Sequence, residues 1–204
     1  MRWAFLAAIA MAAFAVPAAA APVRLMVLGD SLGAGYGLAP AQSFPARLAA
    51  DLAAAGRPVE MLDASVSGDT SAGGVARLKD ALNRHPDAVL VELGANDALR
   101  AIDPKITAAN LDQIASRLDD AHIKYILLGM RAPSNWGRDY QTRFDALYPR
   151  LAAAHHVPLY PFLLDGVALD PKLNQPDLLH PNAAGADLIA HRLTPYVLRL
   201  LAAP

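Results

Sequence analysis

Short, mostly apolar segments alternate with longer amphipathic segments along the chain. Continuous apolar runs of this kind are typical of parallel strands that are covered on both faces. We predict strands at residues 24–28, 59–64, 88–92, 124–129 and 157–160, and helices at residues 43–55, 71–84, 107–122, 139–155 and 182–201, with Asn182 as the N-cap of the last helix. The regular order of strand and helix predicts an α/β fold, a three-layer α/β/α sandwich with a parallel sheet.

The N-terminal segment has a different pattern. Arg2 is followed by an uninterrupted apolar run over residues 4–16, then by Pro17 and four alanines. This is the pattern of a cleavable secretory signal peptide. The apolar run has 13 residues, whereas a membrane-spanning helix needs about 20, so a membrane anchor is the weaker interpretation. We therefore predict a signal peptide at residues 1–20, a single domain at residues 21–204, and a periplasmic or secreted protein.

Composition and charge exclude several classes of function. The chain has no cysteine, which excludes thiol catalysis, cysteine-ligated metals, disulfides and a lipid-anchored lipoprotein. The signal segment contains one of the 18 basic residues and none of the 19 acidic ones, so the remaining chain has a formal charge of −2. A nucleic-acid partner is not expected at this charge, and there is no basic amphipathic helix for membrane docking. His155 and His156 have no third ligand at a recognisable spacing, so no metal is expected.

Four short motifs follow predicted strands or lead into the last helix. Ligands of parallel α/β sheets bind at the carboxyl ends of the strands, so residues at these positions are candidates for function. The motifs are Gly29-Asp30-Ser31-Leu32, Ser67-Gly68-Asp69-Thr70, Gly94-Ala95-Asn96-Asp97 and Asp177-Leu178-Leu179-His180. Taken singly, each one could be a simple turn or a helix cap. Together they provide a hydroxyl, an amide donor and a histidine with an aspartate three residues before it, which can hold one imidazole nitrogen.

The glycines around Ser31 admit other interpretations. Gly29 and Gly33 are expected to permit a tight turn that exposes the serine hydroxyl. Residues 29–33 also match the G-x-S-x-G motif of α/β-hydrolases, but here the serine follows the first strand and the candidate acid is only three residues from the histidine, so we reject that fold. The glycine-rich run at residues 33–37 fits neither a P-loop nor a dinucleotide-binding spacing, and no cofactor is expected.

In combination, the motifs resemble those of the SGNH hydrolase superfamily, also called GDSL esterases and lipases. The resemblance rests on the segments V-L-G-D-S-L-G-A-G-Y-G, D-A-S-V-S-G-D-T-S-A-G-G, V-L-V-E-L-G-A-N-D-A-L-R and D-L-L-H-P-N. It is greatest to the bacterial periplasmic branch of acyl-CoA thioesterases, lysophospholipases and arylesterases. It implies a flavodoxin-like sandwich with a five-stranded parallel sheet.

The resemblance also implies roles for individual residues. Ser31 corresponds to the nucleophile, His180 to the general base and Asp177 to its partner. The oxyanion hole would comprise the backbone N–H groups of Ser31 and Gly68 and the side chain of Asn96. Asp69, Asp97 and Arg100 lie near these blocks and are expected to brace loops.

The residues expected to contact the substrate are Asp30, Ala132, Trp136, Leu178 and Leu179. Leu178-Leu179 stands where relatives often carry a glycine, Ala132 where they often carry leucine, and Trp136 where they carry tyrosine. These differences leave the chemistry unchanged but bear on acyl-chain preference.

The activity implied is hydrolysis of small-molecule acyl esters or thioesters by a monomeric serine hydrolase. Two alternatives stay open: a carbohydrate O-deacetylase of the same superfamily, and a non-catalytic flavodoxin-like binding domain.

Overall fold

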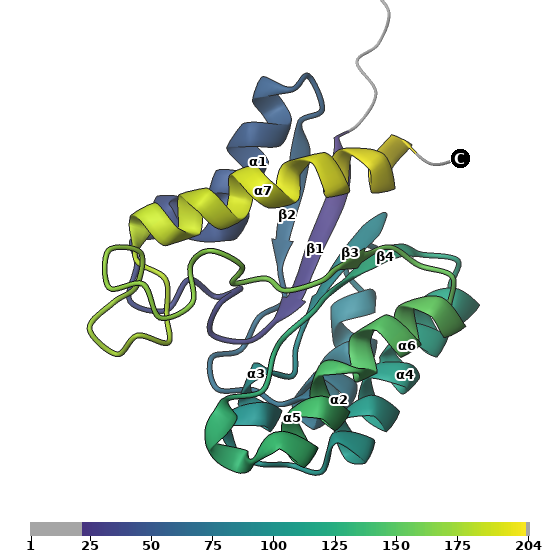
Figure 1. Cartoon of the computed structure of the whole chain (residues 1–204). Helices are drawn as coiled ribbons and strands as arrows, with labels where there is room; N and C mark the ends of the chain where they lie inside the picture. The colour runs from purple at the N-terminus through teal and green to yellow at the C-terminus, as the bar shows by residue number, and fades with distance from the viewer. Residues whose placement is uncertain (1–21, 203–204) are drawn as a thin grey trace, which may run out of the picture.

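The strands form one parallel sheet. The computed structural model describes residues 22–202. The strands are β1 (Val23–Gly29), β2 (Val59–Asp63), β3 (Ala88–Glu92), β4 (Lys124–Leu128) and β5 (Leu159–Tyr160). Their order in the sheet is β2-β1-β3-β4-β5, and every pairing is parallel. The order 2-1-3-4-5 is that of flavodoxin-like sandwiches, so the predicted fold class is confirmed (Figure 1).

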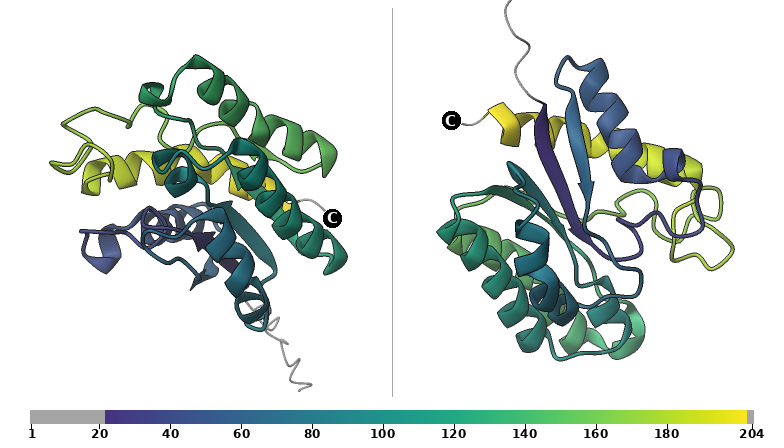
Figure 2. Two further views of the ribbon diagram at one scale, coloured as in Figure 1. Left: turned by 90° about the horizontal axis from the view of Figure 1, so that it is seen from below. Right: turned by 180° about the vertical axis from the view of Figure 1, so that it is seen from behind.

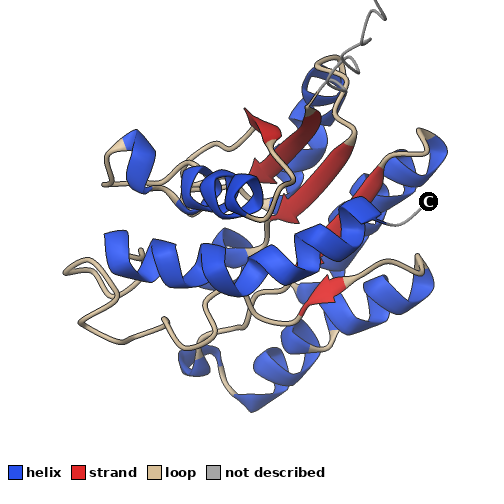
Figure 3. Cartoon of the chain, turned by 90° about the horizontal axis from the view of Figure 1, so that it is seen from above, coloured by secondary structure: helices blue, strands red, loops and turns tan. Residues whose placement is uncertain are grey.

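Helices cover both faces of this sheet. They are α1 (Phe44–Ala54), α2 (Ser71–Leu82), α3 (Ala95–Leu99), α4 (Pro104–Asp120), α5 (Arg138–Asp145), α6 (Leu147–Ala154) and α7 (Ala183–Ala202), with short 3-10 helices η1 (Pro40–Gln42) and η2 (Ser134–Trp136). Helices α1 and α7 pack together on one face, whereas α2, α4 and α6 pack side by side on the other (Figure 2). Figure 3 shows the strands between these two layers from above. None of the helices in residues 22–202 has the length and apolarity that crossing a membrane requires. The predicted signal peptide lies outside the described residues.

The core follows from the sequence pattern. Every residue of β3 is buried, as a central strand covered on both faces requires. Helix α4 buries Leu111, Ile114, Ala115 and Leu118, which recur every three or four residues and so form one apolar stripe toward the sheet. The elements that carry the site are therefore held by a continuous apolar core.

The helices differ from the sequence prediction in three places. Helix α4 starts earlier than expected, because Asp103 caps its Lys105 N–H and Pro104 occupies the first turn. The single helix predicted over residues 139–155 is two helices, α5 and α6, because Pro149 cannot donate to the carbonyl of Asp145. The short helix α3 was not predicted. Asn182 caps α7 as expected, since its Oδ1 accepts from the N–H groups of Ala184 and Gly185.

His155 links two helices by an ion-pair cluster. It ends α6, and its Nδ1 and Nε2 lie 2.7 and 3.0 Å from carboxylate oxygens of Asp119 and Asp112, both on α4. Burial acts to lower the pKa of His155, but the hydrogen bonds and charges of the two aspartates outweigh it, so the pKa is raised. Both ring nitrogens of His155 thus interact with carboxylates. The charged imidazolium also suits a helix C-terminus.

We expect this cluster to make stability depend on pH. Because the folded-state pKa of His155 is raised, its contribution is complete below the ordinary histidine value of about 6.5 and is lost as pH rises through the raised pKa. His155→Gln should therefore lower the free energy of unfolding by about 1 kcal/mol at pH 6 and by less at pH 9. Urea denaturation at both pH values measures this difference. His191→Gln is the matched control, because its side chain is 84% exposed; an equal loss at the two pH values for His155→Gln would contradict the assignment.

Candidate active site

The strand order brings the sequence motifs to one end of the sheet. β1 lies between β2 and β3, so the turns that follow these three strands are neighbours. The boundary between β1 and β3 is the topological switch point, where parallel α/β sheets bind their ligands. Helix α3 and the long loop before α7 reach the same end (Figure 1). All four motifs are therefore brought together, as the carboxyl-end rule predicted.

Ser31, His180 and Asp177 form a continuous hydrogen-bonded chain. Ser31 Oγ lies 2.9 Å from His180 Nε2, and His180 Nδ1 lies 2.6 Å from Asp177 Oδ2. The other carboxylate oxygen of Asp177 accepts from the backbone N–H groups of Leu179 and His180, each at 3.0 Å. Burial slightly opposes ionisation of Asp177, but the hydrogen bonds from His180 and Leu179 lower its pKa to about 2. Asp177 is therefore an anion through the neutral range, and it can orient the imidazole and stabilise its cation.

The loop that carries this pair is held in a strained conformation at Leu178. Its φ is +56°, in the left-handed region that a leucine rarely adopts. A glycine at this position would carry the same φ without a steric cost. The hydrogen bonds that Leu179 and His180 donate to Asp177 span Leu178 and hold the turn in place.

Two backbone N–H groups near Ser31 are available to a ligand. Within residues 22–202, neither the N–H of Ser31 nor that of Gly68 donates to a protein acceptor. Gly68 has φ +82°, and an added Cβ would meet only Arg100 Nη2, at 3.8 Å, so glycine is needed here for its backbone angle and not for space. Arg100 Nη2 donates to the Gly68 carbonyl at 2.8 Å and braces the loop.

Asn96 faces the same region from the first turn of α3. Its Nδ2 donates to Asp30 Oδ2 at 3.0 Å, which leaves the second amide hydrogen free for a ligand. The next residue, Asp97, is fully buried, and it accepts from the N–H and hydroxyl of Ser71 at 2.8 and 2.5 Å and from the Thr107 hydroxyl at 3.1 Å. Asp97 thus ties α3 to α2 and α4, in line with the expected bracing role.

The remaining loop brace is Asp69. It accepts from Arg77 Nε at 2.7 Å, and the same guanidinium also donates to the carbonyls of Gly29 and Ala64. Arg77 therefore joins the ends of β1 and β2 to the loop that carries Gly68. Sequence reasoning did not identify Arg77.

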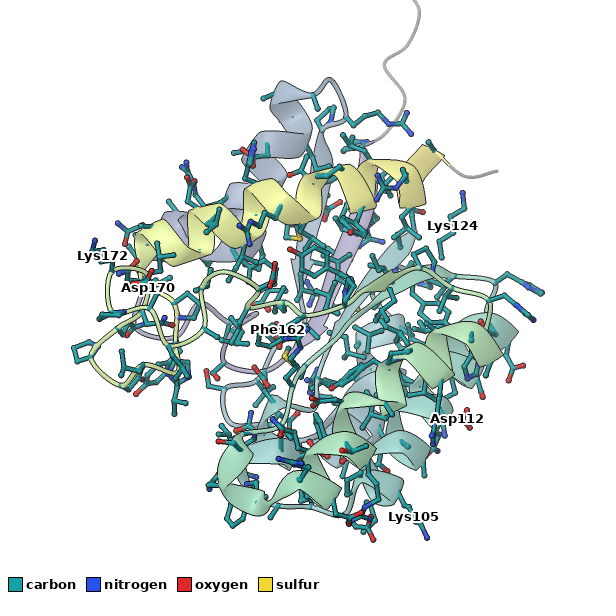
Figure 4. All side chains as sticks on the ribbon, viewed as in Figure 1. Lys105, Asp112, Lys124, Phe162, Asp170 and Lys172 are labelled. Atoms are coloured by element: carbon teal, nitrogen blue, oxygen red, sulfur yellow. The ribbon has the colours of Figure 1, made fainter. Side chains whose placement is uncertain are left out.

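An apolar groove of about 270 Å³ opens beside Ser31 and His180. Its walls include Ala132, Leu178 and Leu179, as the sequence predicted, together with Phe162 and Leu169. Figure 4 shows Phe162 near the carboxyl ends of the strands, whereas Lys124 lies at the opposite end of the sheet. The groove offers a hydrocarbon surface that begins at the serine hydroxyl.

Two of the predicted substrate contacts lie elsewhere. Asp30 is fully buried beneath the Ser31 turn, so the prediction that it touches substrate is wrong. Its carboxylate binds Asn96 and the Leu32 N–H instead. Trp136 is 42% exposed in η2 and does not line the groove. The motif placed Asp30 next to Ser31 in the chain, but the local turn directs its side chain inward.

Sequence reasoning also missed three residues around the site. The Tyr36 ring lies 4.6 Å from the His180 ring, centroid to centroid. Gln175 Nε2 donates to the carbonyls of Tyr36 and Pro181 at 2.7 and 3.0 Å. It therefore joins the loop that follows Ser31, called the serine loop below, to the loop that carries His180. Glu92 is an acidic residue type at the end of a wholly buried strand, and this mismatch between residue type and burial was the one signal available in the sequence.

The fold and the site together define a serine hydrolase built on a flavodoxin-like sandwich. Residues 27–188 match the model of the GDSL-like Lipase/Acylhydrolase family. The chain belongs to this family, and it is an enzyme of the serine hydrolase class that acts on acyl ester or thioester bonds.

Individual relatives are similar over nearly the whole chain. An arylesterase of Vibrio mimicus is 40% identical over 85% of this chain and 87% of its own length. The thioesterase 1/protease 1/lysophospholipase L1 of Escherichia coli K12 is 42% identical over 88% of this chain and 87% of its own. The crystal structure of TesA superposes with a TM-score of 0.82 at 37% identity, covering 87% of this chain and 99% of that one.

Replacing Asn96 tests whether its free amide hydrogen serves the reaction. Loss of one donor to a developing oxyanion costs about 10²- to 10³-fold in kcat, and we expect this loss for Asn96→Ala. Steady-state hydrolysis of p-nitrophenyl butyrate measures it, with thermal denaturation to establish that the variant is folded. Asn83→Ala, an exposed asparagine at the end of α2, is the control. An unchanged kcat in folded Asn96→Ala would remove Asn96 from the site.

Proposed function

We propose that this enzyme hydrolyses acyl esters and thioesters through an acyl-enzyme on Ser31. The observation that carries the proposal is the unbroken chain from Asp177 through His180 to Ser31, which ends at the mouth of an apolar groove. A serine hydroxyl is a weak nucleophile until an adjacent base removes its proton, and His180 Nε2 is the base within reach.

The reaction then runs in two halves. His180 takes the Ser31 proton as Oγ attacks the acyl carbonyl, and it gives the proton to the departing alcohol or thiol. The N–H groups of Ser31 and Gly68 and the amide of Asn96 stabilise the tetrahedral oxyanion. In the second half, His180 removes a proton from water as the water attacks the acyl-enzyme, and it gives this proton to Ser31 Oγ as the carboxylic acid departs. Asp177 stays ionised throughout and holds the imidazole in the required tautomer.

The groove favours a hydrocarbon acyl group over a sugar. Its walls are mostly aliphatic and aromatic, and Leu99, Leu169 and Leu179 expose 44%, 70% and 46% of their surface around it. Removal of such apolar area from water supplies binding energy for an alkyl chain, whereas a carbohydrate would need hydrogen-bonding partners. We infer that the substrates include aryl esters, thioesters and lysophospholipids, as the names of the relatives indicate for those proteins. Carbohydrate O-deacetylation is the second candidate activity.

The cellular location of the enzyme can be inferred from its N-terminal segment. The N-terminal sequence pattern supports export, so we propose that the mature protein acts in the periplasm or outside the cell as a monomer, without a metal or cofactor and on small-molecule substrates.

A panel of p-nitrophenyl esters from acetate to decanoate tests the activity. Wild-type mature protein should turn these esters over, and Ser31→Ala should lose essentially all turnover while keeping its thermal stability. The chain length with the highest kcat/KM reports the depth of the groove. If neither protein hydrolyses any ester or acyl-CoA although both are folded, the proposal fails, and acetylated sugars become the next substrates to measure.

Narrowing the groove should shift the chain-length preference. Ala132 is 4% exposed and lines the groove, so Ala132→Leu adds bulk where long acyl chains would lie. We expect kcat/KM for decanoate to fall by about tenfold or more, the equivalent of one or two lost methylene contacts, while acetate is hydrolysed as before. Ala53→Leu, on the exposed side of α1, should change neither. Parallel losses on both esters would show that Ala132 is not a chain-length determinant.

A further inference from the structure

A second carboxyl group lies beneath the nucleophile turn. Glu92 is the last residue of β3, is paired in register with Gly29 of β1, and has no exposed surface. Its Oε2 accepts hydrogen bonds from the backbone N–H groups of Asp30 and Gly33, at 3.0 and 2.9 Å. These two residues flank Ser31, so one carboxyl oxygen holds both sides of the turn that presents the hydroxyl.

The two glycines of the motif make room for this carboxyl. Neither Gly29 nor Gly33 has a left-handed φ, so the turn does not need glycine for its backbone angle as the sequence suggested. An added Cβ on Gly29 would overlap Glu92 Oε2, and one on Gly33 would lie 3.0 Å from the same atom and overlap Ser65 Oγ. The turn is therefore packed around Glu92, and the glycines admit its carboxyl group.

The protonation of Glu92 follows from what surrounds its other oxygen. Oε1 is buried without a hydrogen-bond donor, and the adjacent carboxyl, that of Asp30, is also fully buried. Two buried carboxylates in contact, one with an unpaired oxygen, would be strongly unfavourable. Burial, together with the neighbouring charge of Asp30, raises the pKa of Glu92 well above its ordinary value.

Asp30 is the member of the pair that can hold the charge. Burial raises its pKa as well, but its carboxylate accepts hydrogen bonds from the Leu32 N–H and from the Asn96 amide, and the neighbouring Glu92 and His180 also act to lower its pKa. Each of these interactions favours its ionised form. A proton on Glu92 Oε1, donated to Asp30, satisfies the one carboxyl oxygen that otherwise has no partner.

We propose that Glu92 is a neutral carboxylic acid that donates to the Asp30 carboxylate, and that this pair is the positioning device of the catalytic site. The proton stays on Glu92 throughout the reaction. Through Oε2, Glu92 holds the Ser31 turn. Glu92 also fixes the Asn96 amide through Asp30. Asp30 Oδ2 accepts one hydrogen of that amide and so directs the other hydrogen outward. The catalytic consequence rests on the proposed function, whereas the protonation of Glu92 does not.

Infrared difference spectroscopy tests the protonation directly. At neutral pH the wild type should show the C=O stretch of a buried, protonated carboxyl, shifted in D₂O, and Glu92→Gln should remove it. Glu60→Gln, an exposed glutamate on β2, should leave the band unchanged. Absence of the band, or its persistence in Glu92→Gln, would overturn the proposal whether or not the enzyme hydrolyses esters.

A pair of substitutions at Glu92 tests the positioning role. Glu92→Leu removes the acceptor and the donor, so the Ser31 turn and Asn96 lose their anchors, and we expect kcat to fall by about 10²-fold with KM little changed. Glu92→Gln keeps an acceptor for the two N–H groups and an N–H donor for Asp30, and should restore most of the kcat that Glu92→Leu loses.

The kcat values of Glu92→Leu and Glu92→Gln distinguish a positioning role from its absence. A folded Glu92→Leu with wild-type kcat, or a folded Glu92→Gln as impaired as Glu92→Leu, would overturn the positioning role. If Glu92→Leu does not fold, the kcat of Glu92→Gln relative to wild type still decides it. Inactivity of the wild type toward every ester and thioester would instead refute the proposed function and leave the infrared result to stand alone.

Discussion

The site depends on the parallel pairing of β1 with β3. This pairing sets Gly29 opposite Glu92, so the two strands end at the same level and the chain leaves them side by side. The turn with Ser31 and the helix with Asn96 must then share one edge of the sheet, although more than 60 residues separate them in the chain. Because both strands lie within the apolar core, the sheet holds this arrangement with little freedom.

The other half of the site is built in a different way. Asp177 and His180 lie on the long loop between β5 and α7, which has no helix or strand of its own to stiffen it. An isolated antiparallel bridge pairs Asn174 with Pro181, and side-chain amides add further hydrogen bonds to the backbone of the loop. Asn174 donates to the carbonyls of Val167 and Asp170, and Asn182 donates to those of Lys172 and Asn174. Gln175 then ties this loop to the serine loop, so that the base stays within hydrogen-bonding distance of Ser31.

The polar and apolar parts of the site occupy separate regions, the first serving the reaction and the second serving substrate recognition. The buried acids Glu92, Asp30 and Asp97 lie below the turn and accept hydrogen bonds from N–H groups and, at Asp97, also from hydroxyl groups. The groove above them is lined mainly by apolar side chains. A substrate therefore meets hydrocarbon walls and a small set of oriented donors, and the charges that orient those donors are kept out of its reach.

The sequence by itself determined the sheet, its covering helices and the four motifs, because strand periodicity and the positions of polar residues after strands are local signals. It did not reveal the break at Pro149 within a helical pattern, nor that Asp30 turns inward and Trp136 lies away from the groove, since side-chain direction depends on the local backbone. Only the tertiary structure joined Glu92 to Gly29 and Gly33, Tyr36 to His180 and Gln175 to Tyr36. These contacts are between residues distant in the chain, and the physical reason for the two motif glycines, space for a buried carboxyl, exists only once β1 and β3 are paired.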